Sequence, residues 1–225
     1  MNDLELSIYY TFIYESRWKI FLSGLMMTLI LTLTSFLFGS LLGALFCAIR
    51  FSKNKTIAKI ANAINQFMVQ LPTLVLLMVF VYLIFGQSSI STTIVAIIGL
   101  TMKTAAYMCD IFYSAVIAVN PGEIEAARAL GMNATQAFLN VTLPQAVKNG
   151  LSLYQNQFVS CLQETSIVGT LAITDLTKAS SIVTSRTLDA LFCLISISIL
   201  YILIGYFANL IIGVVGKEHH LGDKA

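Results

Sequence analysis

The long uncharged runs of this chain constrain its fold more than any other feature. No charged residue occurs in the thirty residues from Ile20 to Ile49, or in the forty-three from Ile60 to Met102. A helix needs about 20 apolar residues to cross the hydrocarbon core of a bilayer, so the second run must hold more than one span. Charged residues make up 11% of the sequence, whereas about a quarter is usual for a soluble domain. We therefore expect a polytopic, all-α membrane protein.

Turn-prone residues divide the longer run. The patch Gly86-Gln87-Ser88-Ser89 forms a natural break, because Gly and Ser favour turns. We predict a single transmembrane domain over residues 1–225, with about five spans at residues 20–49, 60–86, 92–118, 150–172 and 188–215. Pro72 lies within the second span, where its missing N–H is expected to bend or break the helix and to free carbonyls that another group must satisfy.

Small residues recur at helical spacing on the first predicted span. Gly39 and Gly43 form a G-x-x-x-G pair, and Thr28, Thr32 and Ser35 continue the same face. Small side chains let two helices approach closely in a membrane. This face is expected to pack against another helix, within the chain or across a dimer.

Lys and Arg indicate the orientation, because they accumulate in cytoplasmic segments. Placing the segments after the first, third and fifth spans in the cytoplasm puts these residues inside: Arg50, Lys53, Lys55, Lys59, Arg128, Lys148, Lys217 and Lys224. Only Arg17, Lys19, Lys178 and Arg186 then lie outside. The amino terminus is therefore expected outside, and the loop at 120–149 in the cytoplasm. The acidic start of the chain and the length of the first apolar run predict a retained span rather than a cleavable signal peptide.

Residues 120–145 form the one long polar stretch of the chain, and we expect them to be its working surface. Asn120 is placed to cap a short helix, with Pro121 at the first helical position and Glu123 returning a bond to the cap. Gly131 then supplies the left-handed residue that ends this helix.

A second short helix is expected directly after this turn. Asn133 and Gln136 repeat the capping spacing. We predict that this helix stops near Leu143, because Pro144 restricts the residue before it. The first helix also carries alanines that are small enough to fit a groove on another protein: Ala126, Ala127 and Ala129.

The spacing of Glu125-Ala126-Ala127, Gly131 and Leu143-Pro144 resembles the cytoplasmic "EAA" loop of permease subunits in bacterial ATP-binding-cassette (ABC) importers. The resemblance extends over roughly Gln70 to Gly205 and looks like the polar amino-acid branch of that family. Further matching residues lie on both sides of the loop: Ala106-Tyr107, Asp110-Ile111, Asn156-Gln157-Phe158, Glu164-Thr165-Ser166 and Asp175-Leu176-Thr177.

This resemblance implies a type I ABC importer permease fold in the bacterial cytoplasmic (inner) membrane, and the function of a permease subunit of an ATP-driven amino-acid importer. Two permease subunits, identical or related, would form the pore as a homodimer or heterodimer. An ABC ATPase dimer would bind ATP and Mg and dock on the cytoplasmic loops, while an extracytoplasmic binding protein would deliver substrate. The residues expected to couple to the ATPase are Glu125, Ala126, Ala127, Arg128, Gly131, Leu143 and Pro144.

Motifs for chemistry are missing from the sequence. It contains no G-x-x-x-x-G-K-[ST] phosphate loop, no paired-His metal motif and no G-x-S-x-G turn, and its histidines are His219 and His220 near the end. Four cysteines lie in apolar segments at wide spacing, which predicts buried thiols rather than a disulfide framework or a metal site. We expect no catalysis, no metal and no cofactor in this chain. Its net charge of +2 without a basic patch also predicts no nucleic-acid partner.

Ionisable residues inside the predicted spans indicate a polar path, because each costs about 2.5–3.5 kcal/mol at the bilayer centre. Lys103 and Asp110 are seven residues apart and share a helix face with Tyr107. Glu164 lies on the fourth span, on a face that also carries Gln157 and Ser160, at successive spacings of three and four. The residues expected to line the path are Gln70, Thr73, Lys103, Tyr107, Asp110, Gln157, Ser160 and Glu164.

Two interpretations of these charges stay open. An amino acid needs a cation or amides for its carboxylate and an anion for its ammonium, which Lys103 with Asp110 or Glu164 would supply. Alternatively, Lys103 pairs with one of the acids and only locks the spans together. The kink at Pro72 is likewise either plain packing or a substrate contact.

The chain also departs from the pattern that it resembles. The family usually has Asn-Ser-Gly where this chain has Lys103-Thr104-Ala105, and Arg at the position of Tyr113. Such departures suit one half of a heterodimer in which the partner makes the main ligand contacts.

Two other functions fit parts of the sequence. An ion-gradient-driven secondary transporter of small polar solutes would use Asp110 and Glu164 as ion sites, but it leaves the polar loop unexplained. A membrane scaffold would use the loop to recruit a partner, but it has no need for buried charges.

Overall fold

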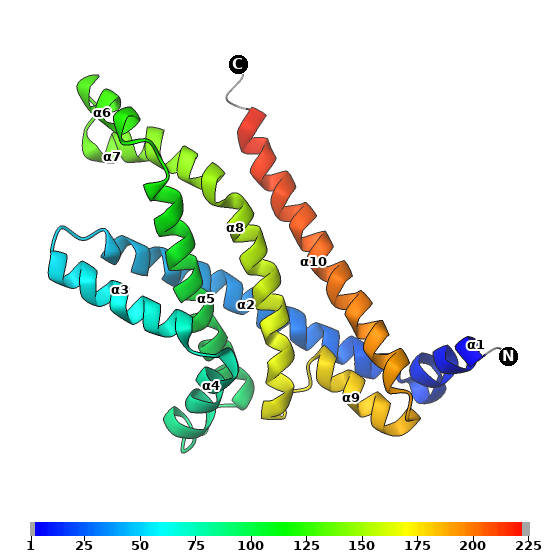
Figure 1. Ribbon diagram of the computed structural model, residues 1–225. Coiled ribbons are helices and arrows are strands. Elements are labelled where there is room, and N and C mark those ends of the chain that lie inside the picture. The colour runs from blue at the N-terminus through cyan, green and yellow to red at the C-terminus, as the bar shows by residue number, and fades with distance from the viewer. Residues whose placement is uncertain (1–2, 222–225) are drawn as a thin grey trace. The chain divides into compact units, whose positions relative to one another are not determined.

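The computed structural model describes residues 3–221, with side chains for residues 5–214 (Figure 1). Its helices are α1 (Asp3–Ile8), α2 (Trp18–Arg50), α3 (Lys55–Gln70), α4 (Thr73–Met78), α5 (Thr92–Ile117), α6 (Pro121–Ala129), α7 (Ala134–Ala137), α8 (Leu143–Glu164), α9 (Leu176–Thr187) and α10 (Ala190–Leu221). Wider π turns occupy Tyr9–Ile13, Val79–Ile84 and Phe138–Thr142, and tighter 3₁₀ turns occupy Tyr14–Ser16 and Thr165–Leu171. The part of the chain that the structure describes has no strand, which confirms the predicted all-α class. The side chains of Lys217, His219 and His220, and the whole of Lys224, lie outside the described residues.

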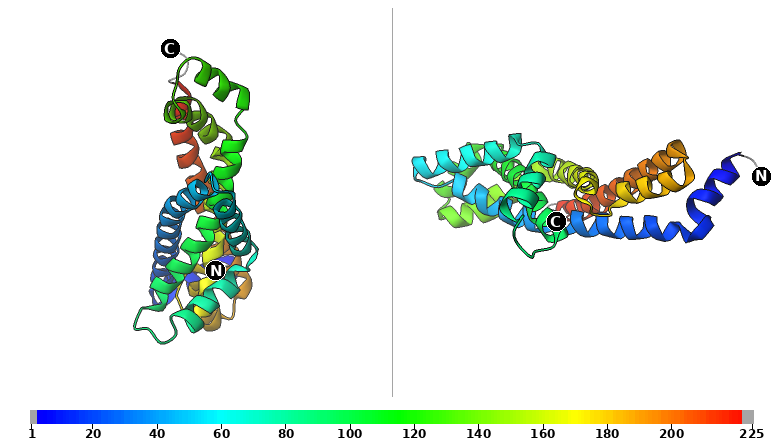
Figure 2. Two further views of the ribbon diagram at one scale, coloured as in Figure 1. Left: turned by 90° about the vertical axis from the view of Figure 1, so that its left-hand side faces the viewer. Right: turned by 90° about the horizontal axis from the view of Figure 1, so that it is seen from below.

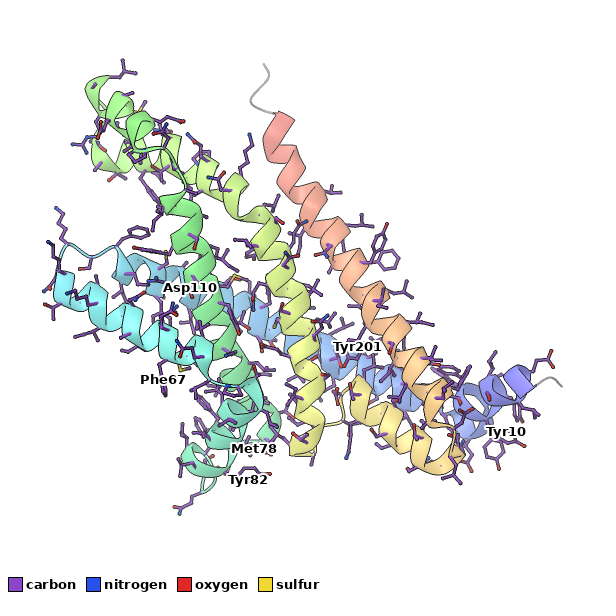
Figure 3. The ribbon with its side chains drawn as sticks, viewed as in Figure 1. Tyr10, Phe67, Met78, Tyr82, Asp110 and Tyr201 are labelled. Atoms are coloured by element: carbon purple, nitrogen blue, oxygen red, sulfur yellow. The ribbon has the colours of Figure 1, made fainter. Side chains whose placement is uncertain are left out.

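Three helices are long and apolar enough to cross a membrane, namely α2, α5 and α10 as far as Val214. Helices α3 and α4, continued by the π turn to Ile84, meet the same criterion only together, as a broken span or a re-entrant loop. The interruption falls at Leu71 and Pro72, so the predicted break is confirmed. Helix α3 exposes Ile64 and Phe67 on one face, which suits a lipid environment (Figure 3).

The fourth predicted span coincides with α8 and the 3₁₀ turn that follows it. Helix α8 begins at Leu143, ahead of the predicted start at 150, and its first turns carry Gln145 and Lys148. It is too polar to count among the candidate spans. A count of five crossings, with the predicted bounds, therefore stays a prediction.

Close contacts divide the chain into two compact units. Unit 1 comprises Met1–Leu37, Leu71–Thr101 and Phe158–Phe207, whereas unit 2 comprises Phe38–Gln70, Met102–Gln157 and Ala208–Ala225. Helices α2, α5, α8 and α10 each contribute one part to either unit. The four cysteines are buried thiols outside any disulfide, two in each unit: Cys161 and Cys193 in unit 1, and Cys47 and Cys109 in unit 2.

Unit 1 has an apolar core in which small polar residues of α2 are also buried. Thr28, Thr32 and Ser35 are fully buried. The hydroxyl oxygen of Thr28 accepts a hydrogen bond from the Leu176 N–H at 3.0 Å, which joins α2 to the start of α9. The small face predicted on the first span therefore packs within the chain.

Asp175 provides the cap at the start of α9. Its carboxylate accepts hydrogen bonds from the N–H groups of Thr177 and Lys178, both at 3.0 Å. Tyr201 of α10, labelled in Figure 3, donates its hydroxyl to the same carboxylate at 3.4 Å. Burial raises the pKa of the Asp175 carboxyl, and the two backbone N–H groups oppose this by lowering it. Asp175 thus joins the start of α9 to α10.

In unit 2 the G-x-x-x-G pair brings α2 against α5. A Cβ atom added to Gly43 would lie 2.5 Å from the Cβ of Met108 and 2.8 Å from the carbonyl oxygen of Ala105. One added to Gly39 would lie 2.7 Å from the Cβ of Thr104. Real Cβ atoms do not approach so closely, so only glycine permits this helix separation. The predicted close helix contact is confirmed within the chain.

We expect Gly43→Ala to lower the free energy of unfolding by about 1–3 kcal/mol, because the added methyl group must push α2 away from α5. The matched control is Gly205→Ala in α10, where a Cβ would meet its nearest neighbour, Val159, at an ordinary 3.7 Å. Thermal unfolding of the detergent-purified protein measures both. Equal melting temperatures for the two variants would contradict the close-packing argument.

Candidate coupling loop and polar path

Helices α6 and α7 form the connection between α5 and α8 in unit 2 (Figures 1 and 2). The side-chain oxygen of Asn120 accepts a hydrogen bond from the Gly122 N–H at 3.0 Å, and Pro121 is the first helical residue, as predicted. The predicted return bond from Glu123 to this cap is wrong. The Glu123 carboxylate instead accepts a hydrogen bond from the side-chain amide of Gln145, near the start of α8.

The turn between the two short helices has the predicted geometry. Gly131 has φ +92°, which only glycine adopts readily, and its N–H bonds to the Arg128 carbonyl at 3.1 Å. Asn133 and Gln136 then form a complete capping box, with both reciprocal bonds at 2.9 Å. The sequence alone therefore fixes both ends of this turn.

Exposure separates the predicted coupling residues into two groups. Glu125, Ala126 and Arg128 are exposed on α6, whereas Ala127 is 5% exposed and packs inward. Leu130, which the sequence analysis did not single out, is 83% exposed beside the Gly131 turn. An apolar side chain that is so exposed indicates a contact surface more strongly than the buried alanine does.

The prediction that the second helix stops near Leu143 is wrong. The π turn Phe138–Thr142 follows α7 directly, and α8 continues from Leu143. Pro144 therefore lies in the first turn of α8, a position that tolerates its missing N–H. The wider π turn shifts the hydrogen-bond register just before the proline, so the chain stays helical where the sequence suggested an end.

Asp110 is the centre of a polar cluster in unit 2 (Figure 3). Its carboxylate receives Arg50 of α2 at 2.5 Å, and the amides of Asn65 and Gln66 of α3 at 2.9 and 3.3 Å. The Arg50 guanidinium also lies 4.1 Å from the ring centre of Tyr113. Asp110 therefore joins α2, α3 and α5.

Arg50 is the member of this cluster that sequence reasoning missed, since it was assigned only to a cytoplasmic loop. It is the last residue of α2, and its side chain is nevertheless 8% exposed. A signal was present in the sequence. Asn65 and Gln66 are adjacent amides on the next helix, and a partly buried acid on α5 needs donors and a cation.

Lys103 is 1% exposed and donates hydrogen bonds to two carbonyl oxygens near the end of α3, those of Met68 at 3.1 Å and Val69 at 2.7 Å. In an unbroken helix the Met68 carbonyl would bond to the N–H four residues later, which Pro72 lacks. Lys103 thus satisfies carbonyls freed by the break. Its ammonium also lies 5.0 Å from the ring centre of Tyr107.

The other predicted path residues are divided between the units. In unit 1, Thr73 donates its hydroxyl to the Glu164 carboxylate at 3.2 Å, and Ser160 is half-buried one turn before Glu164. In unit 2, Gln157 is buried and Gln70 is exposed. The structure thus pairs Thr73 with Glu164 and places Asp110 and Lys103 in separate polar networks.

These features define a class of protein: a polytopic helical membrane protein whose spans carry polar residues and whose longest connection is an exposed, capped helical loop. Residues 35–218 match the family of binding-protein-dependent transport system inner membrane components. The chain belongs to this family, as a permease subunit of an ABC importer in the inner membrane.

Individual relatives agree with this assignment. The chain is 30% identical over 198 residues to the histidine/lysine/arginine/ornithine transport system permease protein HisM of Salmonella typhimurium, covering 82% of this chain and 83% of that protein. It is 28% identical over 190 residues to the probable amino-acid permease protein YxeN of Bacillus subtilis, covering 83% and 85%. A crystal structure of an amino acid ABC transporter with histidines contains a chain with a TM-score of 0.82 and 29% identity, covering 97% of this chain and 99% of that one.

We expect Asp110→Ala to lower the free energy of unfolding by about 3 kcal/mol, because it leaves the mostly buried Arg50 guanidinium without its anion. Replacing both partners, as Arg50→Met with Asp110→Leu, should restore most of this loss. Ser114→Ala, at an exposed position one turn along α5, is the control. Thermal unfolding in detergent measures all three. If Asp110→Ala keeps wild-type stability but loses transport, Asp110 belongs to the path instead.

Proposed function

We propose that this permease carries amino acids, with the polar residues of its spans lining the path. The names of its relatives support this substrate class, because two permease proteins and one solved transporter are named for amino acids. The chemistry of the spans agrees with it. Glu164 offers an anion for the ammonium of a zwitterion, and buried amides and hydroxyls offer donors for its carboxylate.

The observation that supports coupling to an ATPase is the exposed surface of α6, which the fold holds in a fixed position. Helix α6 is capped at its start, ended by a left-handed glycine and anchored by the buried Ala127, so its exposed residues have fixed positions. Glu125 and Arg128 would make polar contacts to the ATPase, and Leu130 would fill an apolar recess on it. Movement of the ATPases would then be transmitted through α6 as a rigid body.

The proposed assembly follows from this arrangement. Two permease subunits, the same or related, form the pore, an ABC ATPase dimer binds the loops, and an extracytoplasmic binding protein delivers the amino acid. ATP and Mg belong to the ATPase, and this chain performs no catalysis and binds no cofactor. Its amino terminus lies outside and the α6–α7 loop in the cytoplasm, in agreement with the distribution of Lys and Arg. An ion-gradient-driven transporter would not need such a loop.

Charge reversal on α6 tests the coupling. We expect Glu125→Lys to reduce ATP-dependent amino-acid uptake about tenfold or more, since coupling energies of 1–3 kcal/mol depend on such contacts. Glu125 is exposed, so the variant should fold normally. The measurement is uptake of a panel of radiolabelled amino acids by vesicles with ATP trapped inside, for the assembled transporter.

The matched control is Asn149→Lys, which adds a cation at an exposed position of α8 and should leave uptake unchanged. Gly131→Asp is a second variant that alters the shape of the turn, because φ +92° strains any residue with a Cβ. Uptake that persists in both loop variants and follows an ion gradient would overturn the importer proposal.

The path is tested at Glu164. We expect Glu164→Gln to reduce uptake about tenfold, because the amide keeps the shape but removes the anion for the substrate ammonium. Thr73→Val, which removes the hydroxyl that donates to Glu164, should have a smaller effect in the same direction. Gln163→Ala, at an exposed neighbouring position, is the control. Normal uptake by Glu164→Gln would remove this residue from the path and leave it a structural role.

A further inference from the structure

A cavity of ≈ 480 Å³ with a mixed polar and apolar lining is found in unit 1, and none of the predicted path residues lines it. Residues from the N-terminal segment at 6–17 line one side, and residues 186–189, from the end of α9 to the start of α10, line the other. The backbone next to the cavity is strained. Glu15, Ser16 and Leu188 have φ near +55°, although none of them is glycine. Neither the coupling loop nor the proposed path uses this cavity.

Two buried side chains that line the cavity have donors without partners among the described residues. Arg17 is 6% exposed, and its terminal nitrogens bond to the Tyr10 carbonyl at 2.7 Å and to the Glu15 carboxylate at 3.2 Å. Its Nε has no partner. The hydroxyl of Thr11, a fully buried residue, also has none. Leaving such groups unpaired is costly, so a bound acceptor is the natural explanation.

The charges around the cavity specify an anionic acceptor. Arg186 lines the cavity and is exposed. Asp189, the lining acid, is already engaged, because it accepts hydrogen bonds from the Ser7 hydroxyl at 2.7 Å and from the Phe192 N–H at 3.1 Å. The unused donors therefore belong to two arginines and a hydroxyl. This donor set suits the oxygens of a phosphate group.

The surroundings indicate where such a phosphate comes from. Two candidate membrane spans begin here, α2 at Trp18 and α10 at Ala190. Large exposed side chains surround this end of the two helices; they include Tyr9, Tyr10, Tyr14, Trp18, Leu188 and Leu191 (Tyr10 is labelled in Figure 3). Tyr and Trp are enriched at the level of the lipid headgroups. A phosphate at this level is that of a membrane lipid.

We propose that the cavity binds the phosphate of an anionic phospholipid. Neither inner donor is accessible in this structure, so the Arg17 and Thr11 side chains turn toward the cavity as the phosphate binds. The Arg17 Nε and the Thr11 hydroxyl then donate to its oxygens, and the exposed Arg186 supplies the second cation. The aromatic side chains pack against the glycerol and the upper acyl chains. The bound lipid holds the N-terminal segment against the start of α10. This site is independent of which solute the permease carries.

The test measures lipid binding to the purified transporter complex. Native mass spectrometry counts retained lipid, and thermal unfolding in detergent is titrated with phosphatidylglycerol, phosphatidylcholine and inorganic phosphate. For the wild type we expect retained phosphatidylglycerol, and a rise in melting temperature that phosphatidylcholine and inorganic phosphate do not reproduce. Arg186→Gln and Thr11→Val should each weaken phosphatidylglycerol binding about tenfold.

The variants separate binding from folding. Lys178→Gln removes an exposed cation from the same helix, α9, but at a position that does not line the cavity, and it should leave lipid binding unchanged. Thr11→Val removes an unpaired hydroxyl, so a purely structural Thr11 would gain stability without lipid and show the same response to lipid as the wild type. That result would overturn the proposal. So would equal stabilisation by inorganic phosphate, or normal lipid binding by Arg186→Gln with weakened binding of the substrate-binding protein.

Discussion

The break in the helix at Pro72 is the constraint on which the polar interior of this permease depends. Inside a membrane, each freed carbonyl must find a donor within the protein. Lys103 provides it by donating to the carbonyls of Met68 and Val69, so a charge that would be costly in lipid becomes part of the backbone hydrogen bonding. Helix α5 is thereby tied to the end of α3, and the position of one fixes the other.

The two acids in the spans, Asp110 and Glu164, also receive hydrogen bonds from neighbouring helices. Asp110 receives a cation and two amides from neighbouring helices, which leaves it little capacity for a ligand. Glu164 has the Thr73 hydroxyl as a donor, a weaker partner than a guanidinium. Of the two acids that the sequence offers for an ammonium group, Asp110 is therefore the one that its neighbours already hold in a structural role.

Sequence reasoning succeeds where a residue's role is set by its near neighbours along the chain. The caps at Asn120 and Asn133, the turn at Gly131 and the break at Pro72 are local, and each was predicted. It fails where the partner is distant. Nothing near Arg50 in the sequence reveals Asp110, sixty residues later, and nothing near Glu123 reveals Gln145.

Pro144 shows a different kind of limit, since the rule applied there is statistical. Proline disfavours a helical conformation in the residue before it, but a π turn changes the hydrogen-bond register and the helix continues. The consequence is mechanical. Because α7, the π turn and α8 form one continuous helical segment, movement of α7 is passed to α8 without an intervening loop. The side-chain contact from Glu123 to Gln145 adds a second connection between α6 and α8. A loop built this way suits the transfer of motion better than two helices separated by a stop at Leu143 would.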